Sequence, residues 1–408
     1  MKKLKLTTKI FLGLIVGIIV GLFMQGVPDI AQTYIKPFGT LFINMIKMII
    51  VPLVFSSLIV GAASIGDVKS LGRIGGKTVI YYLSTTAIAV SIGLLLGKII
   101  NPGSGLSIPV DANMAAEQAP SVASILLNII PSNPLNGLVS GNILQIIAFA
   151  LFLGVGCTAI GEEKSKPFVD FFESLAEIMY KITAFIMELS PYGIFALIVP
   201  VISQYGIDVL KPLSMVIFAV YFGCFLHAVL VYSSAVKIFG KISPVKFFKG
   251  IAPAAITAFS TTSSSGTLPV TIKSTRESLG VSEKIASFVL PLGATINMDG
   301  TALYQGVCAL FIAQVYGVDL SFGQIATIIL TATLGSIGTA GVPGGGFIML
   351  TLVLQSVNLP LDGLVLIAGI ERILDMARTS VNVIGDTSCA VVVASTENEL
   401  EPIGEPSS

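Results

Sequence analysis

The sequence predicts an all-α membrane protein with eight transmembrane helices and two re-entrant helical hairpins. Of its 408 residues, 54% are apolar and only 11% are charged, and the mean hydropathy is +0.91. A soluble domain of average composition carries about 25% charged residues, and a single soluble core stops growing near ~300 residues. The apolar part of this chain therefore exceeds what one soluble globule can bury.

Composition also excludes several functional classes. Basic and acidic residues are equal at 23 each, so nothing indicates a nucleic-acid partner. The chain has a single histidine and four cysteines without a C-x-x-C pair, so we expect no haem or zinc centre and four buried thiols. It has no Walker motif for ATP, and it lacks the G-x-S-x-G and G-x-G-D motifs of hydrolases. We therefore expect no enzyme, and His227 is expected to be a hydrogen-bonded packing residue.

A helix needs about 20 residues to cross ~30 Å of hydrocarbon. Eight apolar segments meet this length, at 7–25, 38–64, 77–100, 121–161, 168–206, 211–240, 285–315 and 364–395. The first follows three lysines and imitates a secretory signal, but it lacks an A-x-A-like cleavage site, so we expect an uncleaved helix. The fourth is interrupted by two prolines and a glycine and is expected to be a compound element.

The distribution of Lys and Arg orients these spans, because cytoplasmic loops carry an excess of both. With the N-terminus inside, sixteen of the 23 basic residues fall on the cytoplasmic side. Only Lys36, Lys98 and Lys211 fall at outer ends. We therefore expect a multi-pass protein of the cell membrane (plasma or inner) with both termini in the cytoplasm.

Two further apolar stretches, 244–276 and 320–355, are too long for one straight span and are broken by Gly and Pro. Basic residues flank the first on both sides, whereas the flanks of the second have none. Each stretch is therefore expected to enter and leave the membrane on one face, because two further full crossings would spoil the excess of Lys and Arg on the cytoplasmic side. Their tips, expected at 263–269 and 338–346, carry non-helical backbone, which membranes tolerate only where protein buries it or it lines a wet cavity. The two hairpin-plus-helix units predict an inverted repeat.

Polar residues of the last span form a stripe. Acidic residues inside membrane spans are costly and are functional candidates by default. At about 100° per residue, six polar residues of this span fall within an arc of roughly 100°. They are Glu371, Asp375, Arg378, Thr379, Asn382 and Asp386. The alternative is an ion-pair seam that only locks helices together. Against it, Thr379, Asn382 and Asp386 have no obvious partners within the stripe and offer oxygen ligands.

The span 285–315 is interrupted at 297–301 by Asn, Asp and Gly, which are poor helix-interior residues. Unwound backbone would free carbonyls there, and the side chains add the oxygens that a hard monovalent cation needs. A simple kink is the alternative. Tyr82, Thr85 and Thr86 share one face of the third span and add hydroxyls, a weak signal alone because Thr often bonds its own helix.

Four motifs carry a family resemblance: SSSGTLPVT, NMDGTALYQ, GTAGVPGGG and DMARTSVNVIGD. In this order and spacing, the chain resembles over essentially its whole length the glutamate transporter homologues, the dicarboxylate/amino acid:cation symporters, of the prokaryotic sodium:aspartate/glutamate type. The resemblance implies a homotrimer in membrane lipid that works by an elevator mechanism. It implies a trimerising scaffold from 1–76 and 104–206, a transport domain from 77–103 and 207–396, and a cytoplasmic tail at 397–408.

The resemblance also implies site residues, among which Arg378 would pair with a side-chain carboxylate of the substrate and Asp375 would take its α-ammonium. The implied substrate set is Ser263, Ser264, Thr301, Val342, Gly346, Asp375, Arg378, Thr379 and Asn382. The implied sodium ligands are Tyr82, Thr85, Thr86, Gly293, Thr295, Asn297, Met298, Asp299, Ser336, Ile337, Thr339, Asn382 and Asp386.

Four positions depart from the family pattern. Thr262 and Met376 stand where relatives carry an arginine, and Glu371 replaces a common Asp. Gln305 stands where animal relatives carry a proton-accepting Glu, which weakens the case for proton co-transport.

The expected function is uptake of aspartate or glutamate driven by co-transported sodium. A proton-coupled C4-dicarboxylate carrier is disfavoured by Asp375, which suits an ammonium. A neutral amino acid carrier is disfavoured by Arg378. An anion channel is the alternative from another class, and the charge-balanced binding residues favour occlusion over open conduction.

Overall fold

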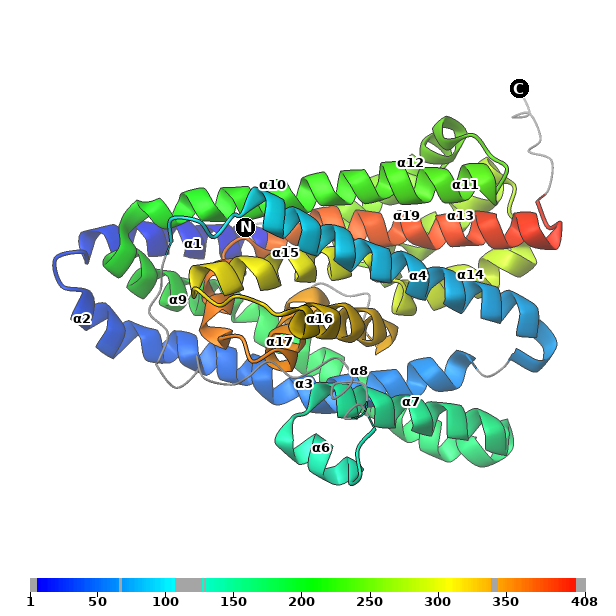
Figure 1. The fold of residues 1–408 in the computed structure, drawn as a ribbon, viewed down its shortest axis with the longest axis horizontal. Helices are drawn as coiled ribbons and strands as arrows, with labels where there is room; N and C mark the ends of the chain where they lie inside the picture. The colour runs from blue at the N-terminus through cyan, green and yellow to red at the C-terminus, as the bar shows by residue number, and fades with distance from the viewer. Residues whose placement is uncertain (1–5, 66–67, 107–126, 128–129, 339–343, 401–408) are drawn as a thin grey trace, which may run out of the picture.

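The computed structural model describes residues 6–65, 68–106, 127, 130–338 and 344–400, and these are helical, with one isolated β-bridge between Val281 and Leu400. The prediction of an all-α fold is confirmed. All four cysteines are buried and free, as expected. The longer helices run mainly along the long axis of the molecule (Figure 1).

The first half of the chain supplies helices that are mostly long. They are α1 (Leu6–Phe23), α2 (Pro28–Ile30), the π-helical η1 (Ala31–Ile35), α3 (Lys36–Ile65), α4 (Val68–Ile100), α6 (Pro134–Ser140), α7 (Ile143–Ile160), α8 (Glu162–Glu188), α9 (Ser190–Tyr205) and the 3-10 turn η2 (Gly206–Val209).

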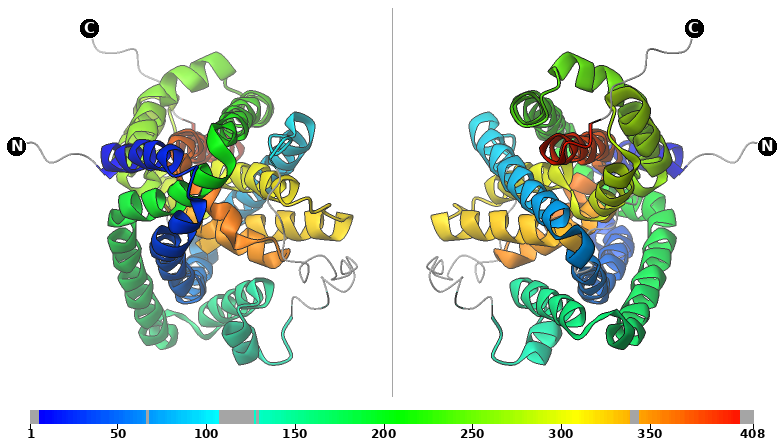
Figure 2. Two further views of the ribbon diagram at one scale, coloured as in Figure 1. Left: turned by 90° about the vertical axis from the view of Figure 1, so that its left-hand side faces the viewer. Right: turned by 90° about the vertical axis from the view of Figure 1, so that its right-hand side faces the viewer.

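The second half is more broken. Its elements are α10 (Leu210–Leu226), the π-helical η3 (His227–Tyr232), α11 (Ser233–Ile238), α12 (Pro244–Thr261), α13 (Ser264–Leu279), α14 (Glu283–Ile296), α15 (Asp299–Val315), α16 (Phe322–Gly335), the 3-10 turn η4 (Ser336–Gly338), α17 (Gly345–Ser356), the 3-10 turn η5 (Leu361–Gly363), α18 (Leu364–Ala368) and α19 (Glu371–Glu397). End-on, α19 lies among α4, α10 and α12 to α15 (Figure 2).

Three described helical stretches are long and apolar enough to cross a membrane, at Pro28–Ala63, Arg73–Ile100 and Leu210–Ile238. A fourth arises if the bent pair α8 and α9 is counted as one span. In the segment 168–206, expected to be one span, two helices meet at 55°, and their forming a single bent span stays a prediction. Pro191 opens α9 and lacks the N–H that would continue the ladder of α8. The count of eight spans stays a prediction.

The breaks in the second half are narrower than expected. Only Thr262 and Ser263 separate α12 from α13, because Ser263 caps α13 by accepting from the Gly266 N–H at 3.0 Å. Likewise only Asn297 and Met298 separate α14 from α15, so the helix resumes at Asp299. In the second tip, residues 339–343 lie outside the described part of the chain, and Gly344 has a φ of +85°.

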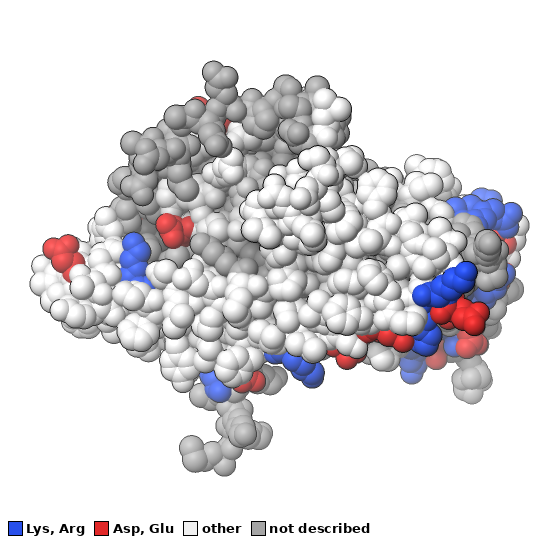
Figure 3. All heavy atoms as spheres, turned by 90° about the horizontal axis from the view of Figure 1, so that it is seen from below, with Lys and Arg blue, Asp and Glu red and all other residues white. Residues whose placement is uncertain are grey.

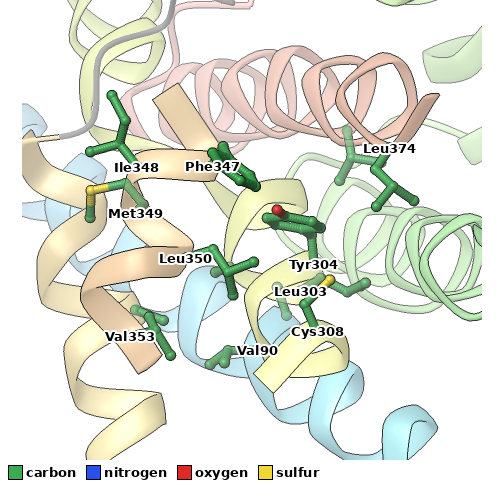
Figure 4. Packing of buried hydrophobic residues seen from close by; sticks show 14 of the residues in the cluster. Val90, Leu303, Tyr304, Cys308, Phe347, Ile348, Met349, Leu350, Val353 and Leu374 are labelled. Atoms are coloured by element: carbon green, nitrogen blue, oxygen red, sulfur yellow. The ribbon is translucent and has the colours of Figure 1, made fainter. Parts of the chain in front are cut away.

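Glycines bring α4 and α15 into close contact. A Cβ on Gly93 would lie 2.1 Å from the Leu303 carbonyl oxygen, and one on Gly306 would lie 2.7 Å from the Val90 carbonyl oxygen. Small residues let helix backbones approach in this way in membranes, where dispersion contacts replace the hydrophobic effect. Beside this seam, Tyr304 of α15 lies next to Phe347 of α17 (Figure 4), whereas Leu303 packs against Gly223 of α10.

Gly93→Ala is therefore expected to destabilise the protein by about 1–3 kcal/mol, the usual cost of overpacking a core. Gly76→Ala is the matched control on the same helix, because a Cβ there would meet nothing within 4 Å. Thermal unfolding in detergent measures both variants. Equal melting temperatures for the two would contradict the close packing of α4 on α15.

A second glycine series joins α1 to α9. Cβ atoms on Gly13, Gly17 and Gly21 would lie 2.3 Å from the Pro191 carbonyl oxygen, 2.3 Å from Ile198 Cγ2 and 2.7 Å from Ile202 Cβ. These glycines recur every four residues and so lie on one face of α1. The fold thus contains two tightly packed helix pairs, α1 with α9 and α4 with α15.

Basic side chains gather mainly at one end of the long axis (Figure 3). At the end of α19, Glu397 accepts hydrogen bonds from Arg73 Nε at 2.9 Å and Lys77 Nζ at 2.6 Å. Lys284 donates to Glu399 at 2.9 Å. These ion pairs tie the start of α4 and the start of α14 to the end of α19.

The hydrogen bonds from Arg73 and Lys77 lower the pKa of the Glu397 carboxyl to about 2. This is below the ~4.3 of an unfolded Glu, so the stabilisation is present above that pH and is lost as the pH falls towards the lowered value. Glu397→Gln should cost no more than about 1 kcal/mol at neutral pH, because its partners Arg73 and Lys77 are solvent-exposed although the Glu397 side chain is only 6% exposed. The substitution should also flatten the acid limb of a melting-temperature profile. Asp170→Asn, in an exposed pair with Lys166 within α8, is the control. An unchanged acid limb in Glu397→Gln would contradict this assignment.

Candidate functional site

Two polar clusters lie along α19, and the first centres on Arg378, whose side chain is 1% exposed. Its Nε donates to Asp375 Oδ1 at 3.0 Å and its Nη2 donates to Glu371 Oε1 at 2.5 Å. The guanidinium carbon lies 4.5 Å from the ring centroid of Tyr304, and the Tyr304 hydroxyl donates to Glu371 Oε2 at 2.8 Å. The charge of Arg378 is thus compensated by two carboxylates and the face of an aromatic ring.

One donor of this guanidinium is unused. Arg378 Nη1 is buried and has no hydrogen-bond partner within the described part of the chain. Beside it lies Gly346 in the first turn of α17, where a Cβ would stand 2.8 Å from Nη1. A side chain at position 346 would therefore collide with the guanidinium. A buried unpaired donor is costly, so this atom marks a place where an acceptor fits.

Asp375 presents its two oxygens in different directions. Oδ1 accepts from Arg378 and, at 3.2 Å, from the Thr379 hydroxyl. Oδ2 accepts from the Gly344 N–H at 3.4 Å and lies 3.7 Å from Arg372 Nη1. The expectation that Thr379 has no partner within the stripe was therefore wrong, because one helical turn brings it to Asp375.

Next to Asp375 is a small cavity of about 40 Å³. On one side Glu371, Arg372 and Asp375 line it with Gly344 and Phe347. On the other side its wall comes from α1, α3 and α9, through Ile10, Phe42, Ser190 and Ile194. The cavity thus separates the charged start of α19 from the helices of the first half of the chain.

The second cluster surrounds the break between α14 and α15. Asn297 Nδ2 donates to Asp386 Oδ1 and to the Asn382 carbonyl oxygen, both at 2.9 Å. The other amide atom, Asn297 Oδ1, is buried without a partner among the described residues. A Cβ on Gly293 would lie 2.5 Å from the Tyr82 hydroxyl and 2.6 Å from Asp386 Oδ1, so only glycine fits there.

Asp299 is held by three side chains from other elements. Its Oδ1 accepts from the Thr86 hydroxyl at 2.6 Å, and its Oδ2 accepts from the Tyr232 hydroxyl at 2.7 Å. His227 Nε2 lies 3.2 Å from the same Oδ2. His227 and Tyr232 are the first and last residues of the π-helical η3, a geometry that is frequent at functional sites.

Asp299 and Asp386 are 0% and 2% exposed. Among the described residues, the only ion-pair contact of either is that between Asp299 and His227. Taking carboxylates out of water costs several kcal/mol each unless positive charge compensates them. Carboxylate, amide and hydroxyl oxygens around unpaired negative charge form a donor set for a hard cation. Within the described ranges no three His, Cys, Asp or Glu side chains group as a metal site.

Asn382 ties α19 to the break between α14 and α15. Its Oδ1 accepts from the Gly300 N–H at 2.8 Å. Its Nδ2 lies 3.3 Å from the Thr301 hydroxyl and 3.2 Å from the Met298 sulfur. A change at the break between α14 and α15 is therefore transmitted directly to α19.

The remaining expected residues are less closely joined to these clusters. Thr85, Thr295 and Ser336 donate to carbonyls three residues earlier, at 3.2, 2.9 and 2.7 Å. The Ile337 carbonyl oxygen faces Gly61 of α3. Ser263 and the buried Ser264 lie at the start of α13. Thr339 and Val342 lie outside the described residues.

Sequence reasoning missed four residues of the site: His227, Tyr232, Tyr304 and Arg372. His227 is buried and hydrogen-bonded, as expected, and its hydrogen-bond partner is the carboxylate of Asp299. A polar residue inside the apolar segment FLHAVL was the available signal. No pattern in the sequence links Tyr232 to Asp299 or Tyr304 to Glu371.

Ionisable side chains buried between the helices of a membrane protein mark a site or path for a charged solute. The model of the "Sodium:dicarboxylate symporter family" matches residues 6–396, and the chain belongs to this family. It is therefore a multi-pass membrane symporter and not an enzyme.

Curated relatives are similar over nearly the whole chain. A "Proton/sodium-glutamate symport protein" of Geobacillus stearothermophilus is 42% identical and covers 98% of this chain and 96% of its own length. A "Proton/glutamate-aspartate symporter" of Escherichia coli is 36% identical, with 98% and 94% covered. A "C4-dicarboxylate transport protein" of Bacillus subtilis is also 36% identical, with 97% and 94% covered.

Proposed function

We propose that this protein takes up L-aspartate or L-glutamate together with sodium ions. The observation that carries the proposal is that two buried polar atoms of the site, Arg378 Nη1 and Asn297 Oδ1, have no hydrogen-bond partner among the described residues. The first is a cationic donor suited to a carboxylate, and the second is a neutral acceptor suited to a cation. The two clusters meet at Gly300, whose N–H donates to Asn382 Oδ1 and where a Cβ would lie 2.2 Å from the Arg378 carbonyl oxygen, so an anion and a cation would bind at adjoining places.

In this proposal Arg378 binds the side-chain carboxylate of the substrate, and Asp375 binds its ammonium. The α-carboxylate is held by hydroxyl and amide groups of α13, α15 and α19, and the second tip covers the substrate from the side of Gly346. These groups are Ser263, Ser264, Thr301, Thr379 and Asn382, with Val342 in the tip.

Sodium ions, the co-transported cargo, are held by two groups of oxygens around Asp299 and Asp386. The first is formed by Tyr82, Thr85, Thr86, Asn297 and Asp299, and the second by Gly293, Asn297, Asn382 and Asp386. A third set of backbone and side-chain oxygens comes from Thr295, Met298, Ser336, Ile337 and Thr339.

The motion proposed is an elevator within a homotrimer, with a scaffold from 1–76 and 104–206 and a transport domain from 77–103 and 207–396. Three observations support this division. The glycine series joins α1 to α9 within the scaffold, and the Gly93–Leu303 contact joins α4 to α15 within the transport domain. The cavity beside Asp375 lies between the two parts.

Two other cargoes are disfavoured, a C4-dicarboxylate, which the name of one relative gives, and a neutral amino acid. A proton-coupled C4-dicarboxylate carrier is disfavoured by Asp375, because a second negative charge would repel an acid that lacks an ammonium. A neutral amino acid has no side-chain carboxylate to accept a hydrogen bond from Arg378 Nη1.

Uptake of radiolabelled aspartate and glutamate into proteoliposomes tests the proposal. We expect accumulation with an inward sodium gradient and none with choline, at constant pH on both sides. Uptake that follows a proton gradient in choline would overturn the sodium coupling. Uptake of labelled succinate without any uptake of aspartate or glutamate would overturn the choice of substrate.

A further inference from the structure

Arg372 occupies a distinctive place beside the ammonium-binding carboxylate. It lies in the first turn of α19, its side chain is 21% exposed, and it forms part of the cavity wall next to Asp375. Arg378 is 1% exposed and fixed by two carboxylates and Tyr304. Of the two arginines within ion-pair distance of Asp375, Arg372 is therefore the more exposed, and its nitrogen is the farther from the carboxylate, at 3.7 Å against 3.0 Å.

The contacts of Asp375 show where an ammonium would enter. Oδ1 is already used by Arg378 and Thr379. Oδ2 lies 3.4 Å from the Gly344 N–H and 3.7 Å from Arg372 Nη1, and both of these residues line the cavity. The pair with Arg372 is longer than a strong ion pair, so a closer cation can replace it.

We propose that Arg372 is an internal counter-ion of Asp375, which a substrate ammonium must displace. This inference rests on the proposed function. Two cations beside one carboxylate oxygen repel each other, so the guanidinium competes with the ammonium of an amino acid. An acid without an ammonium has the opposite need, because only Arg372 then keeps Asp375 from repelling the substrate carboxylates. Arg372 thereby decides between amino acids and C4-dicarboxylates.

The other side chains near Asp375 do not supply the counter-ion in place of Arg372. Thr262 and Met376 are uncharged. The first turn of α19 contains Glu371, which is committed to Arg378 and Tyr304. The wall opposite, from α1, α3 and α9, presents the apolar Ile10, Phe42 and Ile194 and the neutral Ser190 to the cavity. Removing Arg372 therefore removes the one positively charged side chain among the described residues that line the cavity.

The expected effects of Arg372→Gln have opposite signs for two substrates. Aspartate should bind about tenfold more tightly, because its ammonium no longer competes with the guanidinium. Succinate, which has the same chain length and no ammonium, should bind about tenfold more weakly. Arg372→Lys keeps a cation at the position and should leave the ratio of the two affinities near that of the wild type. Arg276→Gln, an exposed arginine paired with Glu283 away from the site, should change neither affinity.

The measurement is equilibrium binding of labelled aspartate to purified full-length protein at saturating sodium, with succinate as a competitor. Tighter aspartate binding and weaker succinate binding in Arg372→Gln support the inference. Loss of affinity for both acids would show that Arg372 only attracts anions, and an unchanged ratio would show that it does not act on Asp375. Either result overturns the inference about Arg372. The proposed function still stands in that case if the wild-type protein binds aspartate. A wild-type protein that binds neither aspartate nor glutamate would overturn both.

Discussion

Arg378→Thr is expected to lower the affinity for aspartate and glutamate by at least about 100-fold, which corresponds to about 2.7 kcal/mol. The substitution removes the charge-assisted donors that would bind the side-chain carboxylate. It also leaves Glu371 and Asp375 buried without the cation that compensates them. Arg378→Cys should behave alike, and in both variants the smaller uncharged side chain gives room for serine or cysteine as substrates.

Binding of labelled aspartate at saturating sodium, with serine as a competitor, measures this change. Arg378→Lys separates charge from geometry, because it keeps a cation but loses the planar fork that matches a carboxylate. Melting temperatures in detergent identify any variant that has lost its fold. An aspartate affinity within about threefold of wild type in a folded Arg378→Thr would mean that another group clamps the side-chain carboxylate.

The second large effect concerns ion coupling at Asp386. Asp386→Asn should flatten the dependence of aspartate affinity on sodium, while affinity at saturating sodium changes much less. The variant keeps the side-chain shape and an oxygen, but it removes the negative charge that would attract the ion. Because ligands of connected sites change each other's affinity reciprocally, losing an ion site removes the sodium-dependent part of substrate binding.

Aspartate titrations at a series of sodium concentrations, with choline as the replacement ion, test this. Asp362→Asn is the control, because Asp362 is exposed in η5. A steep sodium dependence that survives in Asp386→Asn would exclude Asp386 from the coupling. Equal wild-type affinity for aspartate in sodium and in choline would refute sodium coupling altogether.

Sequence reasoning located the polar faces but not all of their partners. The stripe of α19 and the interruption near Asn297 follow from periodicity and from residues that are poor in helix interiors. Their partners are 67 to 89 residues away in the chain, as in the contacts of Tyr304 with Glu371 and of Asn297 with Asp386. Periodicity gives the direction of a side chain from its helix, and it does not say which helix it meets.

Local signals explain the errors at the element ends. Ser263 is a good N-cap, so α13 begins directly after it and the tip is shorter than expected. Ser190 and Pro191 mark a new helix start within the segment expected as one span. The role of Arg372 was not apparent, because its distance from Asp375 depends on side-chain conformations at the start of α19.

The seam between α4 and α15 has a consequence for biogenesis. Gly93 and Leu303 are about 210 residues apart, and synthesis at ~5–20 residues per second separates their emergence by roughly 10–40 s. During that interval the glycine face of α4 lacks its partner and must lie against lipid, other helices or the insertion machinery. The part of the protein that holds the site is therefore completed late, because α15 and then α19 are inserted only after α4 is already in the membrane.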